Sequence, residues 1–599
     1  NVRVRILFNR VFIIITGGKS FFTLSSLLPP LLLQLPPPPP LQLLLINYRV
    51  NFFFFCTGKK KTVKRWRRCR TRKFCLNSVI IIIITFHDKM AKSSTNMETV
   101  LLCSKSKNGN KKNNSYRCSG LLIGERFVIT TGIILIPFLN NEYFDLINNC
   151  NYSKLKMFDT NPMKKIGVWR EIVDRTDVAK SKSSIIEATS RLVAIWKCPL
   201  VERTLRNVFF DWTIEHGCTG EKSLDNDEIR VSKQLLSIFA ILELEDERYG
   251  NVGESRIAST LTMTLEKFLT RPVVRGREIK IISTPFGNDL FINSLSSGII
   301  SNLVGIENCL ILTDARTVPG CEGAPIFSSM KSRYGDDDDN NNLIGLVICP
   351  LTWCKGEWVG FTIGVNLYPI LKELLGKKKI QDENVFPHLD VNSDIPKDLD
   401  EIVVLICNNN IWGSGIVLNS KTVLTCSHVL KNGGEVSVFY KKKHHSCKIV
   451  YKTDDDVPYD LGIVQSENEI FTNFIKFSKE FPTIGDEVIA VGFPFFSDKY
   501  DVNIRPSLSK GSISLIKSNM IQTTCCIQSG FSGGPLLKNG QLIGVIVSNT
   551  RDLGTGAHFP HINFVISSKA FEDVIVKYLE TNNVELLKKL KVINPAIRE

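Results

Sequence analysis

Three residues in the C-terminal third of the chain, His428, Asp460 and Ser532, have types and spacing that suit nucleophilic catalysis. His428 lies in the apolar run VLTCSHVL, Asp460 opens the strand-like run DLGIV further along the chain, and Ser532 follows last, in SGFSGGPLL. Hydrolysis of an amide needs a nucleophile, a base that activates it and a group that orients the base. We therefore predict Ser532 as nucleophile, His428 as general base and Asp460 as the residue that fixes the histidine tautomer.

The glycines around Ser532 supply the remaining requirement, donors for the negatively charged oxygen of the transition state. Gly530, Gly533 and Gly534 can adopt backbone conformations that point amides at one spot. We predict that the N–H groups of Gly530 and Ser532 form this oxyanion hole. A lone histidine or aspartate beside a strand is more often structural, but the order, spacing and GxSGGP motif together favour a catalytic triad.

The pattern around these residues occurs twice in the chain. SGLLIGERFVITTGIIL aligns without gaps on SGIVLNSKTVLTCSHVL, and four further pairs follow in the same order. Those pairs are GREIKIISTPFG with GDEVIAVGFPFF, SGIIS with KGSIS, GCEGAPIF with GFSGGPLL, and LIGLVI with LIGVIV. Five ordered matches indicate that the chain contains two copies of one fold.

The first copy lacks the catalytic residue types. Ile133 stands at the position of His428 and Glu322 at that of Ser532, and no aspartate equivalent can be identified in the apolar run LLSIFAIL. These two landmarks are much farther apart in the first copy than in the second, so the first copy carries an insertion. We expect the first copy to stabilise, regulate or present substrate rather than to cut it.

Composition excludes several other classes of function. The net charge is +16, but residues 1–89 contribute +15 of it through 16 Lys or Arg and one acid, so no basic face remains for nucleic acid. The apolar runs before Met90 are too short to span a membrane, and we expect this region to be translated non-coding sequence or disordered. The 14 later cysteines form no paired CxxC units. Neither a metal nor a cofactor is predicted.

Short β-branched runs ended by Gly, Asn or Pro predict an all-β fold built from tandem double β-barrel domains, the first degenerate, with a short C-terminal helix. We divide the chain into the region 1–89, a degenerate domain at 90–375, a linker at 376–400 and an active domain with its helix at 401–599.

At VLTCSHV, YDLGIV and GFSGGPLL the sequence resembles trypsin-like serine proteases, with their chymotrypsin-like fold, and more specifically the HtrA/Deg branch. The layout of a degenerate copy before an intact one, without a PDZ domain, is similar to that of peroxisomal leader peptide-processing proteases. The resemblance covers about residues 97–590. It implies removal of N-terminal targeting leaders from proteins of the peroxisomal matrix, and self-processing. The implied partners are leader-bearing proteins, with a homo-oligomer as an open alternative and no nucleic acid or membrane.

Departures from the trypsin pattern bear on activation, substrate preference and compartment. Phe531 replaces the aspartate that pairs with the new N-terminus when trypsins are activated, and Cys526 replaces the aspartate that selects basic residues. Cys526 and Ser548 are assigned to the substrate pocket, which we expect to prefer small or apolar residues. Val429 replaces a disulfide-forming cysteine and favours an intracellular compartment. The chain ends in Ile597-Arg598-Glu599, so no Ser-Lys-Leu-like signal supports the peroxisomal localisation. The alternatives are a Deg-like quality-control protease and a peptide-binding scaffold.

Overall fold

A computed structural model describes most of the chain after residue 96. The described residues are 97–105, 115–138, 155–158, 166–173, 183–208, 212–214, 234–245, 259–260, 262–263, 265, 273–328, 342–350, 352–354, 357–376, 395–454, 459–494, 504–551 and 558–591. The predictions for residues 1–89 and for most of the linker lie outside these ranges.

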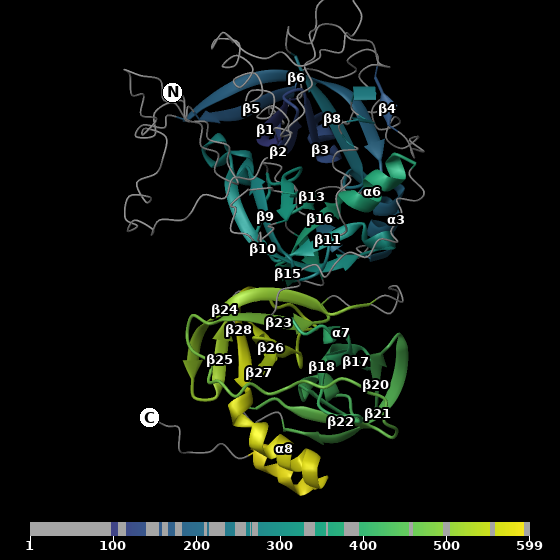
Figure 1. Cartoon of the computed structure of the whole chain (residues 1–599), viewed down its shortest axis with the longest axis vertical. Coiled ribbons are helices and arrows are strands. Elements are labelled where there is room, and N and C mark those ends of the chain that lie inside the picture. The colour runs from purple at the N-terminus through teal and green to yellow at the C-terminus, as the bar shows by residue number, and fades with distance from the viewer. Residues whose placement is uncertain are drawn as a thin grey trace, which may run out of the picture. The chain divides into compact units, whose positions relative to one another are not determined.

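The second copy consists of two closed six-stranded antiparallel barrels (Figure 1). Around the first barrel the order is β17-β18-β19-β22-β21-β20, with bounds β17 Val403–Asn408, β18 Ile411–Val417, β19 Thr422–Thr425, β20 Glu435–Tyr440, β21 Lys443–Lys452 and β22 Gly462–Ser466. Around the second it is β23-β24-β25-β28-β27-β26, with bounds β23 Glu487–Gly492, β24 Ser507–Lys517, β25 Met520–Thr523, β26 Pro535–Lys538, β27 Gln541–Arg551 and β28 His558–Ser567.

The first copy has the same strand connectivity. Its first sheet runs β4-β6-β5-β1-β2-β3-β8, and pairing of β6 with β8 closes six of these strands into a ring. Their bounds are β1 Met97–Lys105, β2 Ser115–Ile123, β3 Phe127–Thr131, β4 Lys156–Met157, β5 Ile166–Val173, β6 Ser183–Lys197 and β8 Ile238–Leu244. The second barrel, in the order β10-β11-β16-β13-β12-β9, comprises β9 Glu278–Ser283, β10 Ser294–Val304, β11 Leu310–Thr313, β12 Pro325–Ser328, β13 Asn342–Cys349 and β16 Thr362–Asn366.

Small elements complete the two copies. A three-stranded sheet joins β7 Trp212–Ile214, β14 Thr352–Cys354 and β15 Glu357–Val359. The described α-helices are α3 Pro199–Val208, α6 Leu367–Leu374, α7 Leu399–Ile402 and α8 Glu572–Thr581. Among the described residues, no helix is both long enough and apolar enough to cross a membrane.

The sequence pattern explains the barrels. Strand β9 alternates half-buried and buried residues along EIKIIS, as a strand with one face toward a core should. Strand β23, EVIAVG, is buried at every position after its first residue. Its alternate residues lie in two different apolar cores, Val488 and Ala490 in one and Ile489 and Val491 in the other. The predicted all-β tandem fold is therefore confirmed.

The predicted C-terminal helix is also confirmed as α8, followed by a 3-10 segment at Val584–Lys591. Ile575 and Tyr578 of α8 and Leu587 of the 3-10 segment are buried in the same core as the strands of the second copy. The helix begins with Glu572 and Asp573 in its first turn, where acidic side chains complement the helix dipole. Its apolar face thus packs against the core of the second copy (Figure 1).

Candidate active site

Strand pairing brings His428 and Asp460 together. His428 is the first residue of a short 3-10 helix that follows β19. The next residue, Val429, is fully buried, whereas 44% of the His428 side chain is exposed. Asp460 lies just before Gly462, and Gly462 pairs with Thr425 at the end of β19. The apolar strands therefore fix the positions of two polar residues that are far apart in sequence.

Two contacts orient the imidazole against the carboxylate. The ring Nδ1 of His428 is hydrogen-bonded to Oδ2 of Asp460, and the backbone N–H of His428 donates to Oδ1 at 3.0 Å. A carboxylate can only accept here, so it holds the proton on Nδ1 and leaves Nε2 as the proton acceptor of the ring. This is the tautomer that a general base for a serine hydroxyl needs.

The turn that carries Ser532 is held by the other barrel of the second copy. The backbone N–H of Ser414, on β18, donates to the carbonyl oxygen of Ser532 at 2.8 Å. The Ser414 hydroxyl donates to Gly530 O at 2.7 Å and accepts from Phe493 N at 3.0 Å. Thr425 Oγ1 in turn donates to Ser414 O at 2.7 Å. One buried serine thus ties the nucleophile turn to the barrel that bears the histidine.

The Ser532 hydroxyl is hydrogen-bonded to a backbone carbonyl in this structure. It donates to the carbonyl oxygen of Val547 at 2.9 Å, and within the described residues no hydrogen bond joins it to His428. Hydrogen bonds between nucleophile and base are often unformed in structures without substrate. The hydroxyl has to release Val547 O before it can donate to Nε2.

The amides around Ser532 differ in whether they are already hydrogen-bonded. Those of Phe531, Gly533 and Gly534 donate to backbone carbonyls at 2.8–3.0 Å, whereas those of Gly530 and Ser532 have no acceptor within the described residues. Gly530 has φ +100°, and a Cβ on it would lie 2.1 Å from the Phe493 carbonyl oxygen, so only glycine fits. The two free amides are the ones predicted from the sequence as the oxyanion hole.

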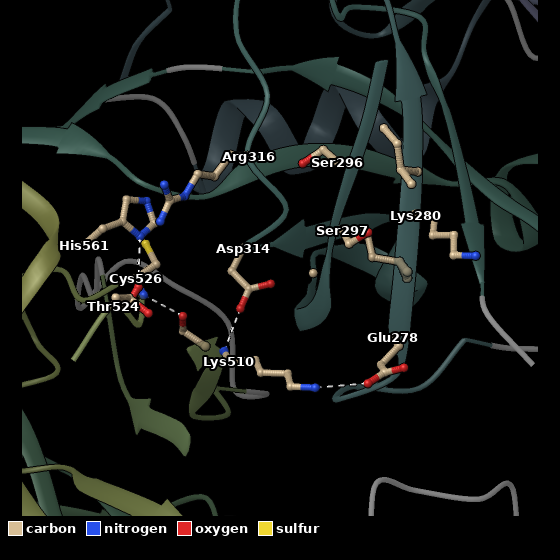
Figure 2. Close-up of a pocket in the computed structure, with 14 residues that line it drawn as sticks. Glu278, Lys280, Ser296, Ser297, Asp314, Arg316, Lys510, Thr524, Cys526 and His561 are labelled. Atoms are coloured by element: carbon tan, nitrogen blue, oxygen red, sulfur yellow. Dashed lines mark hydrogen bonds and ion pairs between the residues drawn. The ribbon is translucent and has the colours of Figure 1, made fainter. Parts of the chain in front are cut away.

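The two residues assigned to the substrate pocket have different surroundings. Cys526 is buried and lines a cavity of about 580 Å³ together with Asp314 and Arg316 of the first copy and His561 of the second (Figure 2). Neither Ser532 nor His428 lines that cavity. Ser548 pairs with Phe564 across β27 and β28, and its side chain lies outside the described ones.

The side chains that line the cavity at Cys526 include groups of both charge signs, the acids Glu278 and Asp314 and the bases Lys280, Arg316 and Lys510. Burial raises the pKa of the Cys526 thiol well above its usual value, so the thiol is neutral. Burial and the nearby Arg316 guanidinium lower the pKa of His561 to about 4, so this ring is neutral too. The guanidinium lies beside the His561 ring in Figure 2, and the Asp314 carboxylate lines the same cavity.

Cys426, His428 and Asp460 also lie close enough together to be considered as metal ligands. Complete burial raises the pKa of the Cys426 thiol far above its usual value, and the thiol donates to the carbonyl oxygen of Ile546 at 3.2 Å. Metal binding requires the thiolate, and Asp460 already accepts two hydrogen bonds from His428. This donor set fits acyl transfer better than metal coordination.

The first copy repeats the same network with other residues at its centre. Ser119 N donates to Glu322 O at 2.9 Å, Ser119 Oγ donates to Gly320 O at 2.9 Å and accepts from Thr284 N at 2.9 Å, and Thr130 Oγ1 donates to Ser119 O at 2.8 Å. Each bond joins positions that the gapless alignments equate with those in the second copy, so the structure supports those alignments.

In the first copy the equivalent turn is occupied by its own side chain. The Glu322 carboxyl group accepts from Gly320 N at 2.7 Å, and Gly320 is the counterpart of Gly530. Burial raises the pKa of Glu322 to about 7, although the Gly320 amide and the Tyr116 hydroxyl favour its charged form. A side chain at the nucleophile position therefore fills the place that an oxyanion would take.

Strand register identifies the residue that the sequence left unassigned. Thr130 pairs with Ala240 as its counterpart Thr425 pairs with Gly462, which places Ile238 at the position of Asp460. The three catalytic positions of the first copy are thus Ile133, Ile238 and Glu322, all buried. Ser414 was also not recognised from the sequence, although Ser119 and Ser414 begin the first pair of aligned segments.

Comparisons with known proteins agree with this geometry. Residues 413–545 match the family described as a trypsin-like peptidase domain. The chain is 29% identical over 438 residues to the peroxisomal leader peptide-processing protease of Homo sapiens, covering 67% of this chain and 72% of that protein. Its Mus musculus counterpart is 28% identical, with 68% and 74% covered. A probable periplasmic serine protease do/HhoA-like of Haemophilus influenzae is 31% identical over 180 residues, covering 29% and 37%.

Proposed function

We propose that this trypsin-like serine endopeptidase removes targeting leaders from proteins of the peroxisomal matrix and also cuts its own chain. The proposal rests on two observations. One copy has the candidate catalytic triad and the other lacks it, and the chain is similar, across both copies, to the human and mouse leader-processing proteases. The Haemophilus relative covers only 29% of the chain, so that similarity does not extend to the paired arrangement.

In the proposed mechanism, His428 Nε2 takes the proton of the Ser532 hydroxyl as Ser532 Oγ attacks the scissile carbonyl. The amides of Gly530 and Ser532 donate to the oxygen that becomes negatively charged. His428 then gives its proton to the leaving amine, and water attacks the acyl-enzyme by the reverse sequence of proton transfers. Asp460 stabilises the imidazolium throughout because it accepts from Nδ1.

The same proposal assigns roles to larger parts of the chain. Residues 401–599 form the catalytic domain with its C-terminal helix, residues 90–375 form the non-catalytic copy, and residues 376–400 join them. Cys526 and Ser548 belong to the pocket that receives the residue before the cut. The neutral Cys526 thiol supports a preference for small or apolar residues there.

The decisive experiment is incubation of the purified protein with a leader-bearing peroxisomal precursor, with cut sites read by mass spectrometry. We expect one cut between the leader and the mature protein, absent with Ser532→Ala. The same precursor without its leader is the matched substrate control and should stay intact. Cuts confined to denatured proteins would instead favour a Deg-like quality-control protease, and binding without any cut would favour a scaffold.

A further inference from the structure

The first copy contacts the nucleophile turn of the second through one aromatic pair. Phe361, between β15 and β16, stacks on Phe531, the residue before Ser532, with ring centroids 6.3 Å apart and 16° between the planes. Both rings are buried, with 1% and 0% of their surface exposed, and both belong to one apolar core that includes residues of both copies.

Phe531 is confined on its other side as well. A Cβ on Gly492, the last residue of β23, would lie 2.8 Å from the Phe531 ring carbon Cδ1, so the ring packs directly on the strand backbone. The Phe531 N–H donates to Gln528 O at 3.0 Å and its carbonyl oxygen accepts from Gly534 N at 2.8 Å. The ring therefore lies between a strand of its own barrel and the first copy.

Further contacts hold Phe361 in this place. Within the compact unit 85–599, strands β10 and β24 lie side by side across the two copies. The Asp314 carboxylate accepts from Lys510 N at 2.6 Å, and the Asn302 amide donates to Arg505 O at 3.0 Å. Lys510 Nζ is 3.1 Å from Glu278 Oε1 (Figure 2). These polar contacts fix the register of the two copies around the aromatic pair.

The two amides of the predicted oxyanion hole, on Gly530 and Ser532, immediately flank Phe531 in the chain. The Ser532 N–H lies in the peptide plane that follows Phe531, and Gly530 directly precedes Phe531, so packing of the ring restrains the segment that carries both donors. In the first copy the equivalent turn is held from within, because Glu322 accepts from Gly320 N. In the described residues of the second copy no side chain accepts from Gly530 N, so that amide is held only indirectly, by the Ser414 hydrogen bonds to the turn and by packing of Phe531.

We infer that Phe361 is a positioning residue for catalysis: the non-catalytic copy holds the oxyanion-binding turn of the catalytic copy in its working conformation by stacking on Phe531. Oxyanion stabilisation depends on donors that are already oriented before charge develops. The inference rests on the peptidase activity and on the proposed roles of Gly530 and Ser532, and is independent of which protein is cut.

The test compares Phe361→Ala and Phe361→Leu with Phe239→Ala in the full chain. Phe239 is a buried phenylalanine of the first copy that packs on Trp196 instead, so its removal costs similar core packing away from the turn. The substrate is a fluorogenic peptide amide, chosen from a peptide library because the wild-type protein cuts it. We expect Phe361→Ala to lower kcat about 10- to 100-fold with little change in KM, since losing a whole oxyanion donor costs about 100- to 1000-fold. Phe361→Leu should fall between it and the wild type.

A matched pair of ligands separates positioning from general destabilisation. A peptide aldehyde gains affinity by adding the Ser532 hydroxyl across its carbonyl and placing the resulting oxyanion on the two amides, whereas the corresponding peptide alcohol cannot. The aldehyde-to-alcohol affinity ratio should fall in Phe361→Ala and stay at the wild-type value in Phe239→Ala. The inference is overturned if folded Phe361→Ala keeps kcat and this ratio within twofold, or if Phe239→Ala lowers both equally. If Phe361→Ala does not fold, wild-type values in Phe361→Leu overturn it.

Discussion

The two copies have nearly identical turns at the nucleophile position but fill them differently. Gly320 and Gly530 have φ +99° and +100°, and Gly323 and Gly533 have φ +81° and +83°. In the second copy the turn presents Ser532 and two amides without acceptors among the described residues, while in the first Glu322 accepts from one of those amides. The backbone of a catalytic turn can thus persist after its chemistry is lost, because the turn is also a structural connection between two barrels.

The two copies also differ in where their polar groups lie. His428 and Asp460 keep 44% and 24% of their side chains exposed. Their counterparts Ile133 and Ile238 are buried, with 0% and 1% of their surface exposed. Apolar residues at these two positions extend the core of the first copy and leave no buried polar side chain at either position.

The largest difference between the copies is expected when the central residue of each turn is replaced by alanine. Ser532→Ala should abolish labelling by a fluorophosphonate and lower kcat about 10⁶-fold, as for other serine nucleophiles that act as part of a triad. Glu322→Ala should leave both labelling and peptide hydrolysis unchanged. An equally severe loss in a folded Glu322→Ala protein would show that the first copy takes part in catalysis.

The orienting position should give the next largest effect. Asp460→Asn should lower kcat about 10⁴-fold because an amide no longer fixes the productive histidine tautomer. At the equivalent place, Ile238→Val should lower the free energy of unfolding by about 1 kcal/mol and leave kcat unchanged. Steady-state kinetics and denaturant unfolding measure the two effects, and a drop in kcat with Ile238→Val would contradict the assignment.

The paired serines between barrels test whether the shared network serves stability, catalysis or both. Ser119→Ala and Ser414→Ala each remove a buried hydroxyl that makes two hydrogen bonds, which should cost about 1–3 kcal/mol of stability. Only Ser414→Ala should also lower kcat, because it releases Gly530 beside the nucleophile. Equal kcat values for the two variants would indicate that the network has no catalytic part.

The smallest effect concerns pH. The pKa of Glu322 is raised to about 7 from 4.5, so the folded protein holds this proton more tightly than the unfolded chain does. Stability from this group is fully present below pH 4.5 and falls as pH rises toward 7, by at most about 1.4 kcal/mol per pH unit. Glu322→Gln should remove this part of the pH dependence, which denaturant unfolding at pH 5, 6 and 7 will measure in both proteins. Parallel curves would contradict the raised pKa.

Several features could be predicted from local sequence alone. VLTCSHVL and YDLGIV read as strand ends that bear polar residues, and the β19–β22 pairing brings those ends together. The structure also supports the alignment of GREIKIISTPFG with GDEVIAVGFPFF, which equates Thr284 with Phe493. The backbone N–H of Thr284 donates to Ser119 Oγ, and that of Phe493 donates to Ser414 Oγ. Such features are recoverable because a residue type at a fixed spacing from glycines or apolar runs leaves a local signal.

Other features leave no such signal. Ile238 lies in a uniformly apolar run, where only the pairing of β3 with β8 shows which residue replaces Asp460. Ser414 looks like any small residue in a strand until the second barrel supplies the Gly530 carbonyl. Phe361 and Phe531 belong to different copies, far apart in the chain, and stack only because the two copies share one core.

The residue types alone indicate which copy has a candidate triad, because Ile133 and Glu322 cannot serve as the base and the serine nucleophile. The sequence also determined the repeated all-β plan, since strand periodicity and glycine turns are local properties. The tertiary structure alone shows how the turns are held. Ser119 and Ser414 bind the two turns in the same way. The Glu322 carboxyl adds a contact from within the first turn, and Phe361 packs on the second from outside. Those contacts arise from packing between distant segments, which no local pattern specifies.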